Sequence, residues 1–87
     1  MPYINQGTRN NLDIKAYPIN NVGVLNYTIN KIIHQYILDF GLQYKTINDV
    51  IGVLECAKLE LYRQIAAPYE DTKKEENGSV SILDRKE

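Results

Sequence analysis

The sequence has little of what most reactive protein sites need. Its 87 residues include one cysteine, one histidine and no tryptophan. One cysteine cannot form an intramolecular disulfide, and a zinc site needs clustered Cys and His ligands. We also reject Cys56 and His34 as a nucleophile and base, because a free helical Cys is usually a packing residue. We therefore expect no metal site and no cofactor.

Phosphate-binding loops and paired catalytic carboxylates are missing as well. The segment NNVGVLN, residues 20–26, has one glycine and matches neither phosphate-binding fingerprint. Glu55 and Glu60 diverge on a helix, and the acids of residues 70–76 are typical of a solvated face. The sequence therefore predicts a protein that is not an enzyme.

Neither the charge nor the hydropathy points to a nucleic acid or a membrane. The formal net charge is −1, whereas proteins that bind DNA or RNA backbones are strongly basic. No apolar run approaches the roughly 20 residues of a membrane-spanning helix. The first eleven residues lack the basic and apolar regions of a signal peptide. We expect a cytoplasmic protein with no DNA, RNA or membrane partner.

Apolar residues recur at helical spacing in a first long segment, from about Val22 to Phe40. Asn21 is the expected N-cap, and Gly41 is the expected residue after the end of the helix. The apolar stripe of this helix consists of Leu25, Ile29, Ile32, Ile33, Tyr36, Ile37 and Phe40.

A second long helix is expected to begin at Thr46, with Thr46 as its N-cap and Asp49 three residues later. It should run to Ala66 or Ala67, because Pro68 cannot continue a helix. Its apolar stripe consists of Ile47, Val50, Ile51, Leu54, Leu61 and Ile65. The stripes of the two long helices are expected to form the core of the monomer. Lys58 falls inside the second stripe, so either its ammonium reaches solvent while its stem lies on apolar surface, or it is held at a packed seam with a partner.

Two shorter polar helices are expected at the ends of the chain. The first helix is predicted over residues 8–16, with Thr8 as its N-cap. The second is predicted over residues 69–76 and should end at Asn77 and Gly78. The predicted fold is all-α: an antiparallel helix pair with a short N-terminal helix and a polar C-terminal helix. We expect one domain over residues 1–78, with residues 79–87 as a docked extended tail or a loose one.

Both long helices carry apolar residues on a second side. In the second helix these are Gly52, Cys56 and Leu59; in the first they are Val24, Tyr27 and Leu38. We call these two second sides the apolar backs of the helices. Two such surfaces in so small a chain favour a homo-oligomer that assembles through them. The alternative is that the N-terminal helix and the tail cover these backs within one monomer.

A cluster of cations and tyrosines is the candidate binding surface. Asn26 flanks the stripe of the first helix, and an asparagine there can form a hydrogen bond across a helix seam. The cluster itself consists of Lys58, Tyr62, Arg63, Tyr69 and Lys73. Such a mixture suits a phosphorylated ligand with a stacking base. It suits a protein interface equally well, since Tyr and Arg dominate such interfaces.

Several segments resemble a family of uncharacterised small proteins of bacteriophages, prophages, bacteria and archaea. They are MPYI at the start, LNYTI at 25–29, IGVLECAKLELYR at 51–63, APYED at 67–71 and ENG at 76–78. The resemblance implies a helical fold and supplies no activity. The matching positions that bear on a site are Asn26, Tyr27, Lys58, Tyr62, Arg63, Tyr69 and Lys73. The chain departs from the pattern at Gln64, where a second Arg is expected, and after Gly78.

By analogy with small phage proteins that oppose host defences, we expect a non-catalytic sponge for a nucleotide-type immune signal. The ligand is expected at subunit interfaces, in the host cytoplasm if a phage encodes the protein. Lys58 and Arg63 would pair with phosphate, Tyr62 or Tyr69 would stack on the base, and Asn26 would fix its orientation. The alternative is a protein-interaction module that uses the same face.

Overall fold

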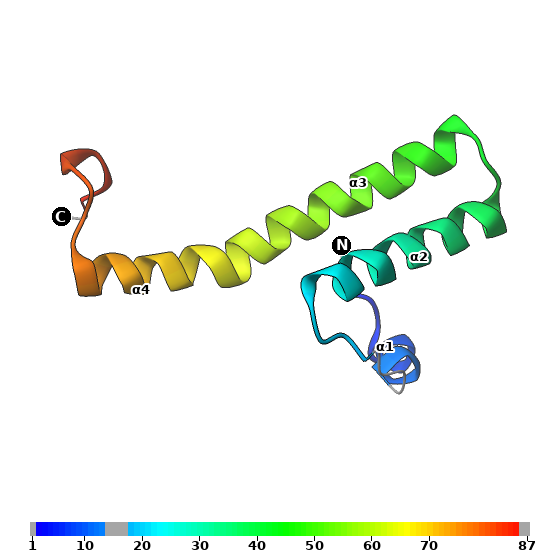
Figure 1. Ribbon diagram of the computed structural model, residues 1–87, viewed down its shortest axis with the longest axis horizontal. Helices are drawn as coiled ribbons and strands as arrows, with labels where there is room; N and C mark the ends of the chain where they lie inside the picture. Colours follow the sequence, from blue (N-terminus) through cyan, green and yellow to red (C-terminus); the bar gives the residue numbers. More distant parts are fainter. Residues whose placement is uncertain (1, 14–17, 86–87) are drawn as a thin grey trace. The chain divides into compact units, whose positions relative to one another are not determined.

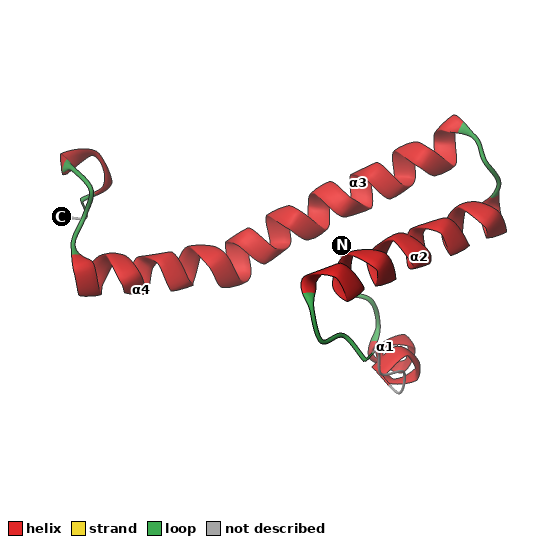
Figure 2. Ribbon diagram, viewed as in Figure 1, coloured by secondary structure: helices red, strands yellow, loops and turns green. Residues whose placement is uncertain are grey.

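The regular structure of the chain is helical. A computed structural model describes residues 2–13 and 18–85. Its elements are α1 (Gln6–Asp13), α2 (Val22–Phe40), α3 (Tyr44–Leu61), the π-helical turn η1 (Tyr62–Ala66), α4 (Ala67–Asn77) and the 3₁₀ turn η2 (Ile82–Asp84) (Figures 1 and 2). No strand occurs in these two ranges, which confirms the all-α expectation.

The chain divides into two compact units, Met1–Leu54 and Glu55–Glu87, with the boundary inside α3. Unit 1 holds α1, α2 and the beginning of α3, while unit 2 holds the end of α3, η1, α4 and η2. A single domain over residues 1–78 stays a prediction.

Helix α1 begins two residues earlier than expected. The Asn5 side chain accepts a hydrogen bond from the Thr8 backbone N–H at 2.9 Å, and the Asn5 carbonyl accepts one from Arg9 N–H at 3.1 Å. Thr8 as N-cap is therefore wrong, because Asn5 already supplies the acceptor for the first free N–H groups. Residues 14–16 of the predicted helix lie outside the described residues.

Helix α2 has the bounds and both caps that the sequence predicts. Asn21 is extended and its side chain accepts from Val24 N–H at 2.8 Å. Gly41, at φ 101° and ψ 145°, ends the helix and donates its N–H to the Ile37 carbonyl at 2.7 Å. That backbone conformation is nearly restricted to glycine.

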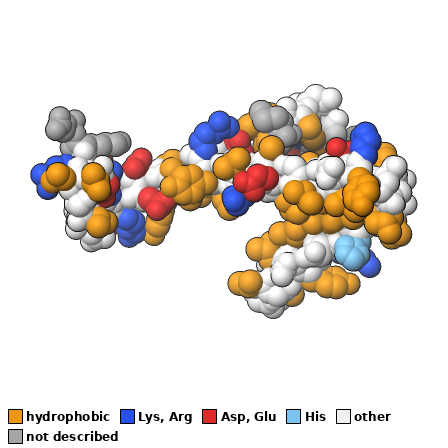
Figure 3. Space-filling view, turned by 90° about the horizontal axis from the view of Figure 1, so that it is seen from above, with side chains coloured by type: hydrophobic (Ala, Val, Ile, Leu, Met, Phe, Trp, Pro, Cys, Tyr) orange, Lys and Arg blue, Asp and Glu red, His pale blue; other side chains and the backbone are white. Residues whose placement is uncertain are grey.

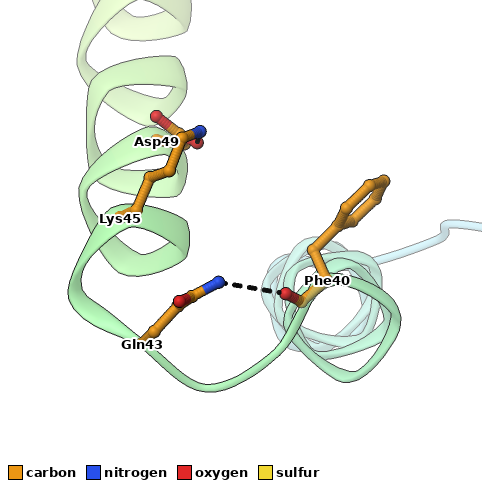
Figure 4. A network of polar contacts seen from close by, with 4 residues as sticks. All are labelled: Phe40, Gln43, Lys45 and Asp49. Atoms are coloured by element: carbon orange, nitrogen blue, oxygen red, sulfur yellow. Dashed lines mark hydrogen bonds and ion pairs between the residues drawn. The ribbon is translucent and has the colours of Figure 1, made fainter.

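Replacing Gly41 with alanine is expected to lower the free energy of unfolding by about 1–3 kcal/mol, the usual cost of a strained backbone. The added Cβ meets only the Gln43 side chain, at 3.7 Å, so the strain lies in the backbone. Urea unfolding followed by circular dichroism measures the change. Gln43→Ala is the control in the same turn, because it removes only a long side-chain bond of 3.3 Å to the Phe40 carbonyl (Figure 4). Equal stability of Gly41→Ala and the parent would contradict this account.

Helix α3 begins at Tyr44, so the predicted start at Thr46 is wrong. Ile47 N–H already donates to the Gln43 carbonyl at 3.0 Å, and Thr46 lies inside the helix. Asp49 does not reach back to a cap, because its carboxylate pairs with Lys45 one turn earlier at 3.0 Å (Figure 4). That hydrogen bond, with the Asp49 charge, raises the pKa of Lys45 above its usual 10.5.

The predicted helix end before Pro68 is also wrong. Ala67 N–H donates to the Tyr62 carbonyl, five residues back, and Pro68 lies in the first turn of α4. Proline lacks an N–H and its ring clashes with the carbonyl four residues earlier. A π-helical turn is wider and relieves this clash, so the chain stays helical. Helix α4 contains the predicted polar helix and ends before Gly78, as expected.

No hydrophobic side chain among the described residues is buried. Thr46, 3 % exposed, is the one buried residue in this part of the chain. Figure 3 accordingly shows hydrophobic side chains at the surface over much of the visible face. The two apolar stripes were predicted to form a monomer core, and that prediction is wrong for the single chain. An apolar stripe stays exposed where no other element covers it.

Candidate functional site

Unit 1 contains an apolar groove between α2 and the first half of α3. Its volume is about 190 Å³, and we call it the unit 1 groove. The lining residues are Ile32, Ile33, Tyr36, Asp49, Val50, Val53 and Leu54. Asp49 is the one charged residue among them. The groove therefore suits an apolar side chain far better than a phosphate group.

Asn26 and Tyr27 also lie in unit 1, on α2. The Asn30 amide donates to the Asn26 carbonyl at 2.9 Å and to the Asn26 side-chain oxygen at 2.8 Å. Asn26 is thus held by its own helix. Tyr27 is exposed and lines a shallow hollow with Asn30, Lys31 and His34. The spacing of three and four residues along α2 places these four on one face.

The two cations that were expected to bind phosphate lie in unit 2, and each pairs with a glutamate of its own helix. Lys58 Nζ lies 3.3 Å from Glu55 Oε1, and Arg63 Nη2 lies 2.7 Å from Glu60 Oε2. The Lys58 side chain is 70 % exposed, as expected for an ammonium that reaches solvent from the apolar stripe. The Lys58–Glu55 pair is exposed on both sides and contributes about 0–1 kcal/mol, so a bound anion can replace Glu55 at little cost. The Glu60 side chain is only 16 % exposed, so its pair with Arg63 is more shielded from solvent.

Tyr69 and Lys73 form the second polar feature of unit 2. The Lys73 ammonium lies 5.5 Å from the centre of the Tyr69 ring and 3.2 Å from Glu76. Lys73 also lines a hollow of about 480 Å³ together with Tyr62. The remaining lining residues are Ala67, Glu70, Asp71, Lys74, Gly78, Val80 and Asp84. Three carboxylates against two ammonium groups leave the hollow with a net negative charge.

The tail is neither extended nor loose over its described residues, contrary to expectation. The Asp84 carboxylate accepts from Val80 N–H at 3.1 Å and from Ser81 N–H at 2.9 Å. The Ser81 hydroxyl accepts from Leu83 N–H at 3.0 Å, completing a capping box. Lys74 Nζ donates to the Asp84 carbonyl at 2.8 Å and ties the tail to α4. We call residues 80–85 the tail turn; its Ser-x-x-Asp spacing was a readable signal that sequence reasoning missed.

The tail turn is expected to depend on the charge of Asp84. Hydrogen bonds from the Ser81 and Val80 backbone hold the pKa of Asp84 below its usual 3.8. A lowered pKa means that the contribution to stability is complete above pH 3.8 and disappears as the pH falls through the lower folded value. The amide NMR shifts of Val80 and Ser81 should therefore change below that pH. Asp84→Asn should abolish this transition, whereas Glu75→Gln should leave it in place.

The predicted site residues fall into two groups. Asn26 and Tyr27 belong to unit 1; Lys58, Tyr62, Arg63, Tyr69 and Lys73 belong to unit 2. Among the residues that the structure describes, no three His, Cys, Asp or Glu side chains gather in a way that could hold a metal ion. Within residues 2–13 and 18–85, no helix combines the length and the apolar character needed to cross a membrane.

These features define a small, all-helical protein whose apolar side chains remain on the surface and whose polar groups line shallow hollows. The chain belongs to the family described as a domain of unknown function, DUF6899, which matches residues 1–80. No curated protein and no solved structure matches the chain.

Proposed function

We propose that this protein is a non-catalytic binder that assembles with copies of itself and captures an anionic, nucleotide-type ligand where the copies meet. The observation that carries the proposal is the lack of any buried hydrophobic side chain among the described residues. Ordering the backbone costs about 1–2 kcal/mol per residue, and burial of apolar surface is the main term that offsets it. A second copy supplies the surface that one chain lacks.

The proposed assembly uses the apolar backs of α2 and α3, which we take to be an antiparallel pair. Three residues join the two helices, and side chains of both line the unit 1 groove. Leu38 and Leu59 are exposed on these backs. A Cβ built at Gly52 meets no atom within 4 Å, which leaves room for the backbone of a second copy.

The proposed ligand site lies on the unit 2 helices. The hollow beside Tyr62 and Lys73 has a net negative charge, so we place the phosphate at Lys58 and Arg63 instead. Both cations are exposed, and the Glu55 partner of Lys58 is exposed too, so an anion can replace it at little cost. The exposed rings of Tyr62 and Tyr69 are the proposed stacking platforms. Asn26 and Tyr27 of a second copy would complete the site.

Native mass spectrometry of the protein, alone and with cyclic and linear nucleotides, tests this proposal. We expect an oligomer that gains a nucleotide in a fixed ratio to the subunits. An oligomer that ignores every nucleotide would refute the ligand, and a monomer at all concentrations would refute the assembly. The proposed biological role is a phage anti-defence sponge in the host cytoplasm, which rests on the family resemblance.

A protein-interaction module is the second candidate. The unit 1 groove favours it, because six of its seven lining residues are apolar or aromatic. Such a groove suits an apolar helix or peptide of a partner protein. An oligomer that ignores nucleotides but retains one partner in a pull-down, and loses it in Val53→Asp, would support this function.

A further inference from the structure

The tail turn presents apolar side chains on a fixed backbone. Val80, Ile82 and Leu83 are 95 %, 75 % and 93 % exposed. Four hydrogen bonds, three within the turn and one from Lys74, nevertheless hold the surrounding backbone in place. A segment that is already ordered loses little conformational entropy when it binds. The turn is therefore built like a binding element, although its side chains contact almost nothing.

The unit 1 groove has the complementary chemistry. Its lining is apolar except for Asp49, whose negative charge suits Arg85, the residue that directly follows η2. The partner of Asp49 in the structure is Lys45, whose side chain is largely solvated. Such an exposed pair contributes little to stability. An arginine can therefore share Asp49 with Lys45, or take the place of Lys45. The tail turn offers apolar side chains followed by a cation, and this chemistry matches an apolar groove that carries one carboxylate.

In its own chain the tail turn is held by contacts within unit 2. Lys74 of α4 donates to the Asp84 carbonyl at 2.8 Å, and Val80 and Asp84 line the unit 2 hollow. The self-assembly proposed above supplies a second copy, whose groove can receive the turn while these contacts stay in place.

We infer that the tail turn of one copy docks in the unit 1 groove of a second copy, with Ile82 and Leu83 in the groove and Arg85 beside Asp49. This inference rests on the proposed self-assembly and specifies one of its contacts. The contact joins two different surfaces, so it leads to a closed ring if the rotation between copies closes, and to a chain of copies if it does not.

A complementation experiment with two full-length variants tests the inference. Leu83→Asp places a charge on the tail turn and leaves the groove unchanged. Val53→Asp places a charge in the groove and leaves the tail turn unchanged. Each variant alone should dissociate at a concentration at least about tenfold higher than the parent. An equimolar mixture should form a one-to-one pair, because one intact tail and one intact groove remain. Sedimentation velocity measures the masses, and circular dichroism checks that the helices persist.

The outcomes separate this inference from the assembly on which it rests. If Leu83→Asp and a second variant, Ile82→Asp, assemble as tightly as the parent, the inference is wrong while the assembly stands. If both variants dissociate but the mixture forms no pair, the tail turn acts elsewhere and the inference is again wrong. If the parent itself is a monomer at every concentration, the proposed assembly fails.

Discussion

Diluting the protein is expected to unfold it. The described residues contain no buried hydrophobic side chain, so in the proposed assembly most of the apolar burial comes from association. Each tenfold dilution lowers the free energy of a two-copy association by about 1.4 kcal/mol. Two chains unfold together in such an association, and for a unit of that size each kcal/mol corresponds to roughly 2–4 °C in melting temperature. Melting curves by circular dichroism over a hundredfold range of concentration should therefore shift by about 5–10 °C.

Two variants make this prediction specific. Ile33→Asp places a charge in the unit 1 groove. It should raise the protein concentration that is needed to reach any given melting temperature. Glu75→Gln changes an exposed acid of α4 and should follow the parent curve. A melting temperature that is independent of concentration, together with a monomeric mass, would show that one chain folds without a partner.

Removing one of the two proposed phosphate-binding cations is expected to abolish most of the nucleotide affinity. Arg63→Ala and Lys58→Ala each delete a charge-assisted hydrogen bond worth about 1.5–3 kcal/mol, so affinity should fall roughly tenfold to a hundredfold. Stability should change by at most about 1 kcal/mol in Lys58→Ala, whose ion pair is exposed on both sides. It should change more in Arg63→Ala, because the Glu60 side chain is only 16 % exposed and loses this partner. Isothermal titration with the nucleotide found by mass spectrometry measures the affinity.

The control for this pair is Lys45→Ala. Lys45 also forms an exposed ion pair on α3, but it belongs to unit 1, whereas Lys58 and Arg63 belong to unit 2. This variant should keep the parent affinity. If all three variants bind the nucleotide equally well, the site is misplaced. If Arg63→Ala or Lys58→Ala dissociates the oligomer, that residue supports assembly instead.

Local signals in the sequence were enough for α2. The Asn21 side chain and the conformational freedom of Gly41 act within a few residues, so both ends of that helix could be predicted without tertiary information. The start of α3 could not be predicted in this way. Thr46 and Asp49 matched a capping pattern, but Asp49 pairs with Lys45 in the preceding turn instead. The continuation of the helix past Pro68 could not be predicted either, since proline excludes an α-helical hydrogen bond but permits a wider turn.

For the candidate site, the sequence supplied the residue types and the two local ion pairs. Glu55 and Lys58, like Glu60 and Arg63, are three residues apart on a helix, and that spacing brings the side chains together. Only the structure shows that the hollow beside Tyr62 carries excess negative charge, because the tail turn contributes Asp84 to its lining.

By itself, the sequence determined that this protein is helical, because apolar spacing and caps are local properties of a chain. It also indicated, through the apolar backs of two helices, that one copy has more apolar surface than one copy can cover. The tertiary structure decided that the predicted stripes enclose no core among the described residues, and that Lys74 of α4 holds the tail through the Asp84 carbonyl. Burial depends on what faces a side chain across space, and that information lies outside any single stretch of sequence.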